Sequence, residues 1–428
     1  MLVRDYLKRS LYEAKSGYFS QTSPIISSKG NKIDFNQIKG GQRGWFKARQ
    51  HFFESMKEEK GDWITQTELF APYFSQVLTE WAIKKVHQEN ENDSLRILEI
   101  GGGNGTNALH FLNHLKTSYP DYYRNTQYVL CEISPTLSKI QRENLHKDHK
   151  EVCTIENRDF LKWNKRLKEK WIILAIEVLD NLPHDKILYK DDVLPDNFVD
   201  SDLNKWEEIL VEEWGVEKRR KLRDPIAIEA AQYFINKQIS AVKRNFNWSI
   251  DGLLTETNKY LTLRKRNKKE KFAKSVFVPS DLVQFLHTVN NNFDDHTLIC
   301  VDFAFLPYPE IEDSKINRSM QGSLFHSRNV PIVSGKHKSN YQIDYPSYIV
   351  PNPSHFDIFF QTDFECLQTA YRNITKGGIS LIQTSKEFMT ENTPEDVKLK
   401  TNTMNGFNPM LEDFENVSFF IGRKRQNK

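Results

Sequence analysis

The stretch RILEIGGGNGT, residues 96–106, decides the fold of this chain. Glycine is scarce elsewhere, with 18 in 428 residues, yet four of them fall between positions 101 and 105. The apolar run before these glycines is typical of a buried parallel strand. The residues after them have helical spacing, and Thr106 or Asn107 is the predicted cap. The stretch therefore predicts a strand, a glycine-rich turn and a helix.

Six further strand-like runs follow this unit, and helical segments separate most of them. The runs cover residues 127–133, 152–155, 171–177, 297–303, 378–384 and 416–422. Strands that alternate with helices indicate an α/β fold with a doubly wound, mostly parallel sheet. We therefore predict a Rossmann-like sheet of seven strands, with a hairpin-like partner near the C-terminus.

The spacing of the strands suggests four regions. An N-terminal helical segment, with an insertion at about 20–60, precedes the first half of the sheet, and a long segment separates the two halves. The expected regions are 1–83, 84–183, 184–296 and 297–428, the last with an excursion at 304–377. We expect 184–296 to be largely helical, with helices at KWEEILVEEW (205–214) and PIAIEAAQYFINKQISAV (225–242).

Composition excludes several classes of protein. Lys and Arg number 60 against 57 Asp and Glu, which is too even for a dedicated nucleic-acid binder. No apolar run reaches about 18 residues, so no membrane span is expected. The first twenty residues lack the apolar core of a secretory signal. Four scattered cysteines form no disulfide or zinc pattern, which fits a reducing compartment.

Two further patterns receive plain interpretations. His110 and His114 have a metal-ligand spacing but lack a third ligand nearby, so no metal site is predicted. The basic runs 217–223 and 264–271 could contact RNA or anionic lipid, but solvated faces or loops are favoured. The sequence says nothing of the oligomeric state.

The glycine-rich turn predicts a ligand over the carboxyl ends of the strands. Dinucleotide enzymes use G-x-G-x-x-G there, but Thr106 occupies the last glycine place. Glu99, at the end of the strand, is awkward for a pyrophosphate and suits a cationic amino-acid group. S-adenosylmethionine carries such a group, so Glu99, Gly101, Gly103 and Gly105 are predicted to bind it.

Two acids at the next strand ends support the same site. Glu132 ends the second strand, where a carboxylate can accept both ribose hydroxyls of either type of cofactor. Asp159 follows the third strand and could accept the adenine amino group. Because these acids end successive strands, we expect them to line one pocket with the glycine turn.

The chain at this point resembles a known family. ILEIGGGNGT is similar to the first motif of class I S-adenosylmethionine-dependent methyltransferases. More closely, most of the chain resembles the MidA-type family, mitochondrial protein arginine methyltransferases that assist respiratory complex I assembly. The similar blocks are DYLKRSLYEAKSGYFS (5–20), GDWITQTELFAPYFSQVLTEW (61–81), EISPTLSKIQ (132–141), EVLDNLP (177–183) and DIFFQTDF (357–364).

The resemblance implies S-adenosyl-L-methionine as cofactor, an arginine-bearing protein substrate such as a respiratory-complex subunit, and a mitochondrial location, with the cytoplasm as the alternative. Thr67, Ile176 and Gln361 depart from the family's Pro, Asn and His. These departures motivate a second hypothesis, a catalytically silent assembly or binding factor that keeps the cofactor pocket. A nicotinamide dehydrogenase is the weakest alternative, because the final glycine is missing.

Methylation of arginine needs acidic side chains, because a protonated guanidinium is a poor nucleophile. Carboxylates can hold the guanidinium in a bidentate fork and receive its proton. Glu177 and Asp180, at the end of the fourth strand, are the predicted catalytic residues. Glu68 and Asp62 are candidates of second rank. A further set is expected to be structural: Asp302, Asp357 and Asp363.

Other methyl acceptors fit the sequence less well. The loop after the fourth strand reads EVLDNLPHD and lacks the (Asp/Asn)-Pro-Pro-aromatic pattern of amide and adenine methyltransferases. No Pro-Cys pair supplies the nucleophile that cytosine methylation needs. The arginine interpretation therefore remains, partly through the family resemblance.

Overall fold

The structure is a computed structural model of the whole chain. It describes residues 1–20, 33–58, 65–88, 94–191, 194–195, 197–212, 215–236, 274–306, 321–324, 327–336 and 342–425. Asp62 and the basic run 264–271 lie outside these residues.

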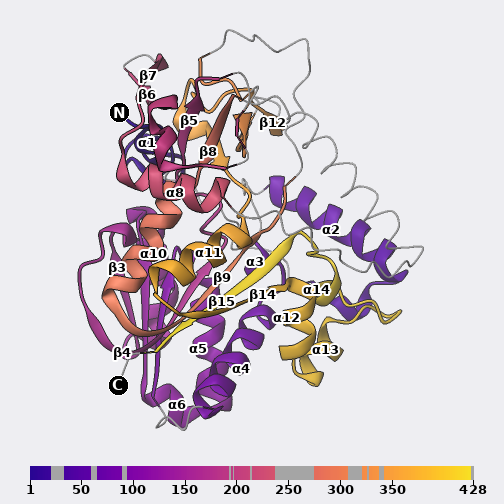
Figure 1. Cartoon of the computed structure of the whole chain (residues 1–428). Coiled ribbons are helices and arrows are strands. Elements are labelled where there is room, and N and C mark those ends of the chain that lie inside the picture. The colour runs from indigo at the N-terminus through magenta and orange to yellow at the C-terminus, as the bar shows by residue number, and fades with distance from the viewer. Residues whose placement is uncertain are drawn as a thin grey trace.

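A seven-stranded sheet forms the centre of the molecule (Figure 1). Its order is β14-β15-β9-β4-β1-β2-β3, and only β15 runs antiparallel to its neighbours. The strands are β1 (Leu95–Ile100), β2 (Thr126–Glu132), β3 (Cys153–Asn157), β4 (Leu167–Ile176), β9 (Phe293–Phe303), β14 (Ile379–Thr384) and β15 (Val417–Lys424). The predicted doubly wound α/β class and its seven strands are confirmed.

Helices cover both faces of this sheet, because alternate strand residues are buried on opposite sides. Ile97 of β1 packs with one group of helices, whereas the adjacent Leu98 packs with the other. The first group contains α4 (Tyr73–Gln88), α5 (Thr106–Ser118), α7 (Pro135–His149) and α12 (Ser385–Asn392). The second contains α8 (Pro225–Ile235), α10 (Ser280–Asn292) and α11 (Phe364–Ile374).

The starts of the predicted helices follow local signals. Ser134 caps α7 by accepting a hydrogen bond from the Leu137 N–H at 3.3 Å, and Pro135 occupies the first helical position. Helix α10 begins at Ser280, and Asp363 caps α11 by accepting a hydrogen bond from the Cys366 N–H. The other α-helices within the described ranges are α1 (Val3–Tyr12), α2 (Gly41–Glu58), α3 (Gln66–Leu69), α6 (Pro120–Arg124), α13 (Glu395–Thr401) and α14 (Pro409–Glu412).

A second sheet, which was not predicted, lies partly in the segment 184–296 that was expected to be largely helical. Its order is β10-β8-β5-β6-β7, and four of its strands come from that segment. The strands are β5 (Asp185–Tyr189), β6 (Trp206–Val211), β7 (Glu217–Lys221), β8 (Ser275–Val278) and β10 (Ser327–Arg328). The helix predicted at 205–214 is β6 instead, because pairing with β5 and β7 overrides its helical propensity. The first part of the helix predicted at 225–242 is confirmed as α8, and residues 237–242 lie outside the described residues.

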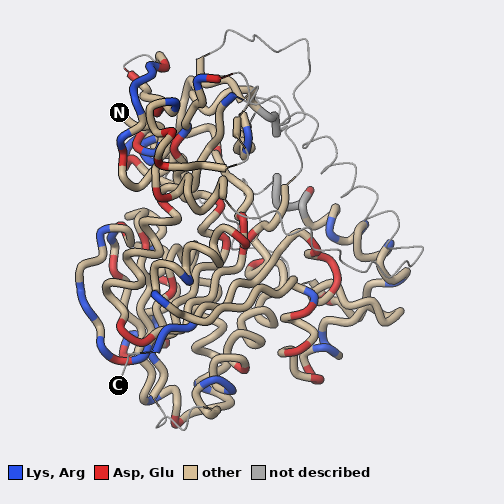
Figure 2. The backbone as a smooth tube through the Cα atoms, viewed as in Figure 1, with Lys and Arg blue, Asp and Glu red and all other residues tan. Residues whose placement is uncertain are grey.

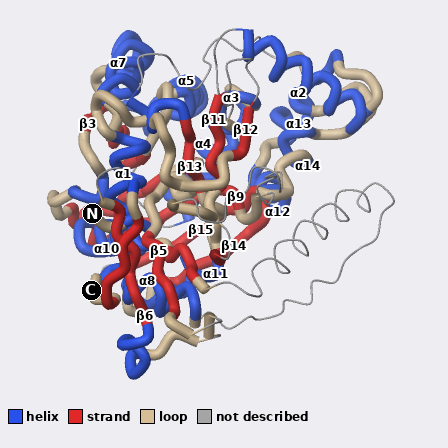
Figure 3. The backbone as a smooth tube through the Cα atoms, turned by 90° about the horizontal axis from the view of Figure 1, so that it is seen from above, coloured by secondary structure: helices blue, strands red, loops and turns tan. Residues whose placement is uncertain are grey.

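The excursion at 304–377 contains a third, small sheet. Its order is β12-β11-β13, with β11 (Ile332–Lys336), β12 (Gln342–Asp344) and β13 (Phe356–Phe359). Figure 3 shows these strands apart from β5 and β6. Within the described ranges, no helix is both long enough and apolar enough to cross a membrane.

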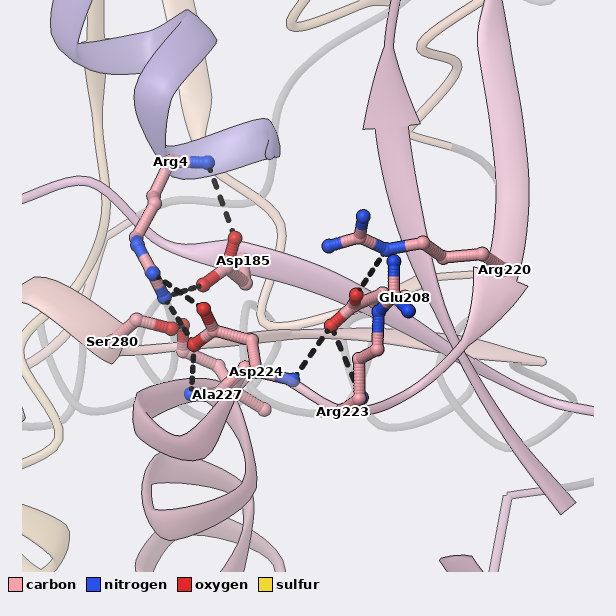
Figure 4. A network of polar contacts seen from close by, with 9 residues as sticks. Arg4, Asp185, Glu208, Arg220, Arg223, Asp224, Ala227 and Ser280 are labelled. Atoms are coloured by element: carbon pink, nitrogen blue, oxygen red, sulfur yellow. Dashed lines mark hydrogen bonds and ion pairs between the residues drawn. The ribbon is translucent and has the colours of Figure 1, made fainter. Parts of the chain in front are cut away.

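Helix α1 is fixed to the second sheet and to α8 by a partly buried ion-pair network (Figure 4). The Arg4 guanidinium donates to Asp185 at 2.6 Å and to both carboxylate oxygens of Asp224 at 2.7 and 2.8 Å. Asp224 also caps α8 by accepting from the Ala227 N–H. Because α1 contributes Val3, Leu7 and Leu11 to a core shared with β6 and β8, polar and apolar contacts fix the same helix.

Replacing Arg4 tests this anchor. We expect Arg4→Met to lower the free energy of unfolding by about 3 kcal/mol, since it leaves the buried Asp185 carboxylate without its cation. Arg9→Met is the matched control, because Arg9 lies on the same helix in an exposed pair with Glu13 and should change stability by less than about 0.5 kcal/mol. Urea unfolding measures both, and equal effects of the two substitutions would contradict the network's role.

Candidate functional site

Two adjoining cavities lie where the predicted strands end. The larger contains about 890 Å³ of empty space, part of it open to solvent, and the smaller about 410 Å³. Both are lined by Gly101, Gly103 and Glu177. Of the other predicted residues, Glu132 and Asp159 line the larger cavity, and Glu68 and Glu99 line the smaller.

The glycine turn brings its backbone to the boundary between the cavities. Gly101 and Gly103 have φ angles of 65° and 54°, which favour glycine. The Gly101 N–H donates to the Cys131 carbonyl at 2.9 Å, so the turn is joined to the end of β2. Gly105 has a different place: it lines neither cavity, and a Cβ there would lie 3.2 Å from Leu145 of α7.

The start of α5 differs from the predicted cap. Its N-cap is Gly105, and the side chains expected to cap it contact acids of the smaller cavity instead. The Thr106 hydroxyl donates to Glu68 at 2.7 Å, and the Asn107 amide donates to Glu99 at 3.1 Å. The two acids are thus held by the first turn of α5.

Glu99 is buried, and its second oxygen accepts from the Tyr128 hydroxyl at 2.6 Å. Burial raises the pKa of Glu99 to about 7, against the two hydrogen bonds that favour its ionised form. Burial also raises the pKa of Glu68. The smaller cavity is therefore rich in carboxyl oxygens.

The two acids predicted to bind the nucleoside lie together in the larger cavity. Glu132 is buried, accepts from the Ser134 N–H at 2.8 Å, and has a pKa raised to about 7 by burial. Asp159 accepts from the Leu161 N–H at 3.0 Å and forms an ion pair with Lys8 of α1 at 2.7 Å. The sequence did not indicate this cation.

Glu177 lies just past β4 in a left-handed conformation, with a φ angle of 51°. Such strain in a residue other than glycine is typical of functional sites. One carboxylate oxygen accepts from the Gln66 N–H of α3 at 3.0 Å. Burial, with the nearby Asp302 and Glu68, raises the pKa of Glu177 to about 8.

Asp180 follows Glu177 by three residues and lines neither cavity. It is buried, and its Oδ1 has no hydrogen-bond partner among the described residues. Burial and the neighbouring Asp302 and Asp357 raise its pKa well above the usual value. Figure 2 shows acidic positions gathered here, in the middle of the molecule between the two sheets.

The three acids expected to be structural accept hydrogen bonds from nearby backbone or side-chain groups, two of them in the loop after β4. Asp302 accepts from the N–H groups of Leu179 and Asp180, at 2.8 and 3.1 Å. Asp357 accepts from the Asn181 amide at 3.0 Å. Asp363 caps α11. These contacts agree with the structural roles predicted for the three residues.

Sequence reasoning missed the wall that the N-terminal segment adds to the larger cavity. Lys8, Tyr12 and Phe19 line it, and the Tyr12 hydroxyl donates to the Asn181 carbonyl at 3.2 Å. The ring planes of Tyr12 and Phe19 are stacked, with centroids 5.5 Å apart. Only the family-like block at 5–20 signalled this segment, since local spacing cannot show contacts with distant loops.

A metal-binding arrangement is not seen in the described part of the chain. There, no group of three or more His, Cys, Asp or Glu side chains is placed to hold a metal ion. His114 contacts Glu80 at 2.7 Å, which accounts for one of the two histidines with metal-like spacing.

The family is shown by comparison with known proteins. Residues 77–380 match the model of a family of S-adenosyl-L-methionine-dependent methyltransferases, and the chain belongs to this family. Its class is therefore that of a methyltransferase with S-adenosyl-L-methionine as cofactor.

Individual relatives agree with this class. A Saccharomyces cerevisiae protein, named protein arginine methyltransferase NDUFAF7 homolog, mitochondrial, is 27% identical over 149 residues. This match covers 35% of the chain and only 34% of the relative.

Two structures from Burkholderia thailandensis cover the whole chain. One, solved with bound S-adenosyl-homocysteine, has 14% identity, a TM-score of 0.56 and 89% of its own length covered. A native structure of a protein from the same superfamily also has 14% identity, with a TM-score of 0.55 and 88% covered. At this identity the likeness shows the shared fold.

The residues of the two cavities fit this cofactor. Gly101 and Gly103 line both cavities, and the carboxylates of Glu132, Glu177 and Glu99 complement hydroxyl groups and positive charge. The cofactor has two ribose hydroxyls, an ammonium and a sulfonium. Its chemical groups therefore match the acceptors along the boundary between the cavities.

A pair of glycine substitutions tests the site. We expect Gly103→Ala to weaken S-adenosyl-homocysteine binding at least tenfold, because Gly103 lines both cavities and its positive φ, 54°, strains any other residue, so the turn would shift. Gly406→Ala is the control: Gly406 also has a positive φ, 81°, but no other atom lies within 4 Å of its added Cβ. Both should lose about 1 kcal/mol of stability. Calorimetry that finds equal affinities for the two variants would contradict the assignment.

The raised pKa of Glu177 predicts an effect on stability. Between an unfolded pKa of about 4.3 and the folded value of about 8, the folded state binds the extra proton, so wild-type stability falls as pH rises. Glu177→Gln lacks this loss. We expect its stability advantage to grow by at most about 1.4 kcal/mol for each pH unit in this window.

Urea unfolding at pH 5.5 and 7.5 measures this difference. Glu143→Gln, on the exposed face of α7, is the control and should show no comparable trend. A Glu177→Gln advantage that is the same at both pH values would mean that Glu177 is not a desolvated acid.

Proposed function

We propose that this methyltransferase modifies an arginine side chain of a protein. The observation that carries the proposal is the position of Glu177, a strained and desolvated acid that lines both cavities. The name of the yeast relative supports the same acceptor class and a mitochondrial location. We extend both to this chain as parts of the proposal.

The cofactor would be held by residues at the strand ends. Glu132 would accept the ribose hydroxyls, and Asp159 would receive the adenine amino group. Gly101 and Gly103 would let the backbone approach the amino-acid part, near Glu99. Glu68 lines the smaller cavity beside Glu99, so we now favour a cofactor role for it over the catalytic role first predicted.

The bound cofactor supplies an electrophilic methyl group. Glu177 would accept N–H groups of the acceptor guanidinium and take up the proton that methylation releases. A pKa of about 8 makes this carboxylate a stronger base than an ordinary glutamate. Asp180 would add negative charge near Glu177. Asp302 would hold the loop that carries Asp180, through its hydrogen bonds to two backbone N–H groups.

Methyl transfer by two variants tests the proposal. We expect Glu177→Gln to keep S-adenosyl-homocysteine affinity within about threefold and to lose methyl transfer about 100-fold, as for removal of a general base. Asp180→Asn should reduce methyl transfer by a smaller factor, because Asp180 lines neither cavity. Glu143→Gln is the control.

The assay uses labelled S-adenosylmethionine and a mitochondrial extract from cells that lack the protein, with mass spectrometry of the labelled residues. Methyl groups found only on residues other than arginine would overturn the acceptor class. Cofactor binding by wild type without any methylated product would instead support the catalytically silent factor. Ile176 and Thr67, two departures from the family, motivate this alternative because both line the smaller cavity.

A further inference from the structure

The N-terminal segment contacts three loops that carry or follow proposed site residues: Glu132 and Asp159 for the cofactor and Glu177 for catalysis. The Phe19 carbonyl accepts from the Ser134 hydroxyl, two residues after Glu132, at 2.8 Å. Lys8 pairs with Asp159 itself. The Tyr12 hydroxyl donates to Asn181, in the loop that follows Glu177. One continuous segment therefore holds the loops after β2, β3 and β4.

The position of this segment is set independently of the cavity. Arg4 fixes the start of α1 to Asp185 of β5 and to Asp224, the N-cap residue of α8, as Figure 4 shows. Lys8 lies one helical turn further along the same helix. The helix thus presents Lys8 to the cavity from a rigid base.

Lys8 interacts electrostatically with two acids that line the larger cavity, Asp159 and Asp281. Its ammonium group lies 2.7 Å from Asp159 Oδ2, and the Leu161 N–H donates to Oδ1, so the carboxylate is held from both sides. Asp281, which lines the same cavity, is nine-tenths buried, and its pKa is raised to about 7 by burial. Lys8 and Arg4 oppose this rise, whereas Asp159 adds to it. Lys8 therefore pairs with Asp159 and lowers the electrostatic cost of ionising Asp281.

We propose that Lys8 is a cofactor-positioning residue that acts through Asp159. Its ammonium group fixes the orientation of the Asp159 carboxylate and keeps α1 against the adenosyl end of the cavity. Removing the charge leaves Asp159 and Asp281 with a like-charge repulsion across the wall, which favours a displaced Asp159. This inference rests on the proposed assignment of the larger cavity to the cofactor.

Calorimetry of S-adenosyl-homocysteine with the full chain tests the inference. Lys8→Met keeps most of the apolar stem and should weaken binding at least tenfold. Lys8→Arg restores the charge and should bind within threefold of wild type. Arg9→Met, in an exposed pair on the same helix, should bind as wild type does.

A double-mutant cycle separates positioning from a structural role. If Lys8 acts through Asp159, adding Lys8→Met to Asp159→Asn should weaken binding by less than twofold. Independent tenfold losses that multiply would overturn the inference, as would unchanged affinity of Lys8→Met. Wild type that fails to bind at millimolar ligand would overturn the cavity assignment itself, and with it the role of Lys8.

Discussion

Desolvation of carboxylates at one edge of the seven-stranded sheet is the constraint on which the rest of the structure depends. Glu99, Glu132 and Glu177 follow or end three central strands, and burial raises the pKa of each. Taking such groups out of water is costly unless donors or cations compensate. Local N–H and hydroxyl donors compensate in part, and a cationic cofactor rich in hydroxyl groups would compensate further.

The surrounding architecture holds these acids in place. Parallel strands bring the acids to a common edge, the glycine turn leaves space beside them, and Asp302 fixes the loop after β4 through two backbone N–H groups. The second sheet contributes indirectly, because it anchors α1 and so brings Lys8 and Tyr12 to the cavity. The proposed cofactor site is thereby enclosed by elements from distant parts of the chain.

The sequence predicted the parts of the site that depend on local signals. A strand followed by clustered glycines, and acids such as Glu132 and Asp159 directly after apolar runs, can be recognised within a few residues. It failed for β6, because an alternation of Glu and apolar residues also suits a helix and only pairing with β5 and β7 decides between them. Lys8 was missed for a related reason, since its contact with Asp159 joins separate regions of the fold. The distinct place of Gly105 depends in the same way on packing against α7.

The central claim is that Glu132, the glycine turn and Glu177 surround one cofactor molecule. A crystal structure of the full chain with S-adenosyl-homocysteine measures this most directly. The account predicts the ribose hydroxyls at the Glu132 carboxylate and the homocysteine part beside Gly101 and Gly103, with its sulfur nearer to Glu177 than to Asp159. A ligand bound away from these residues, with both cavities filled by the chain itself, would contradict it.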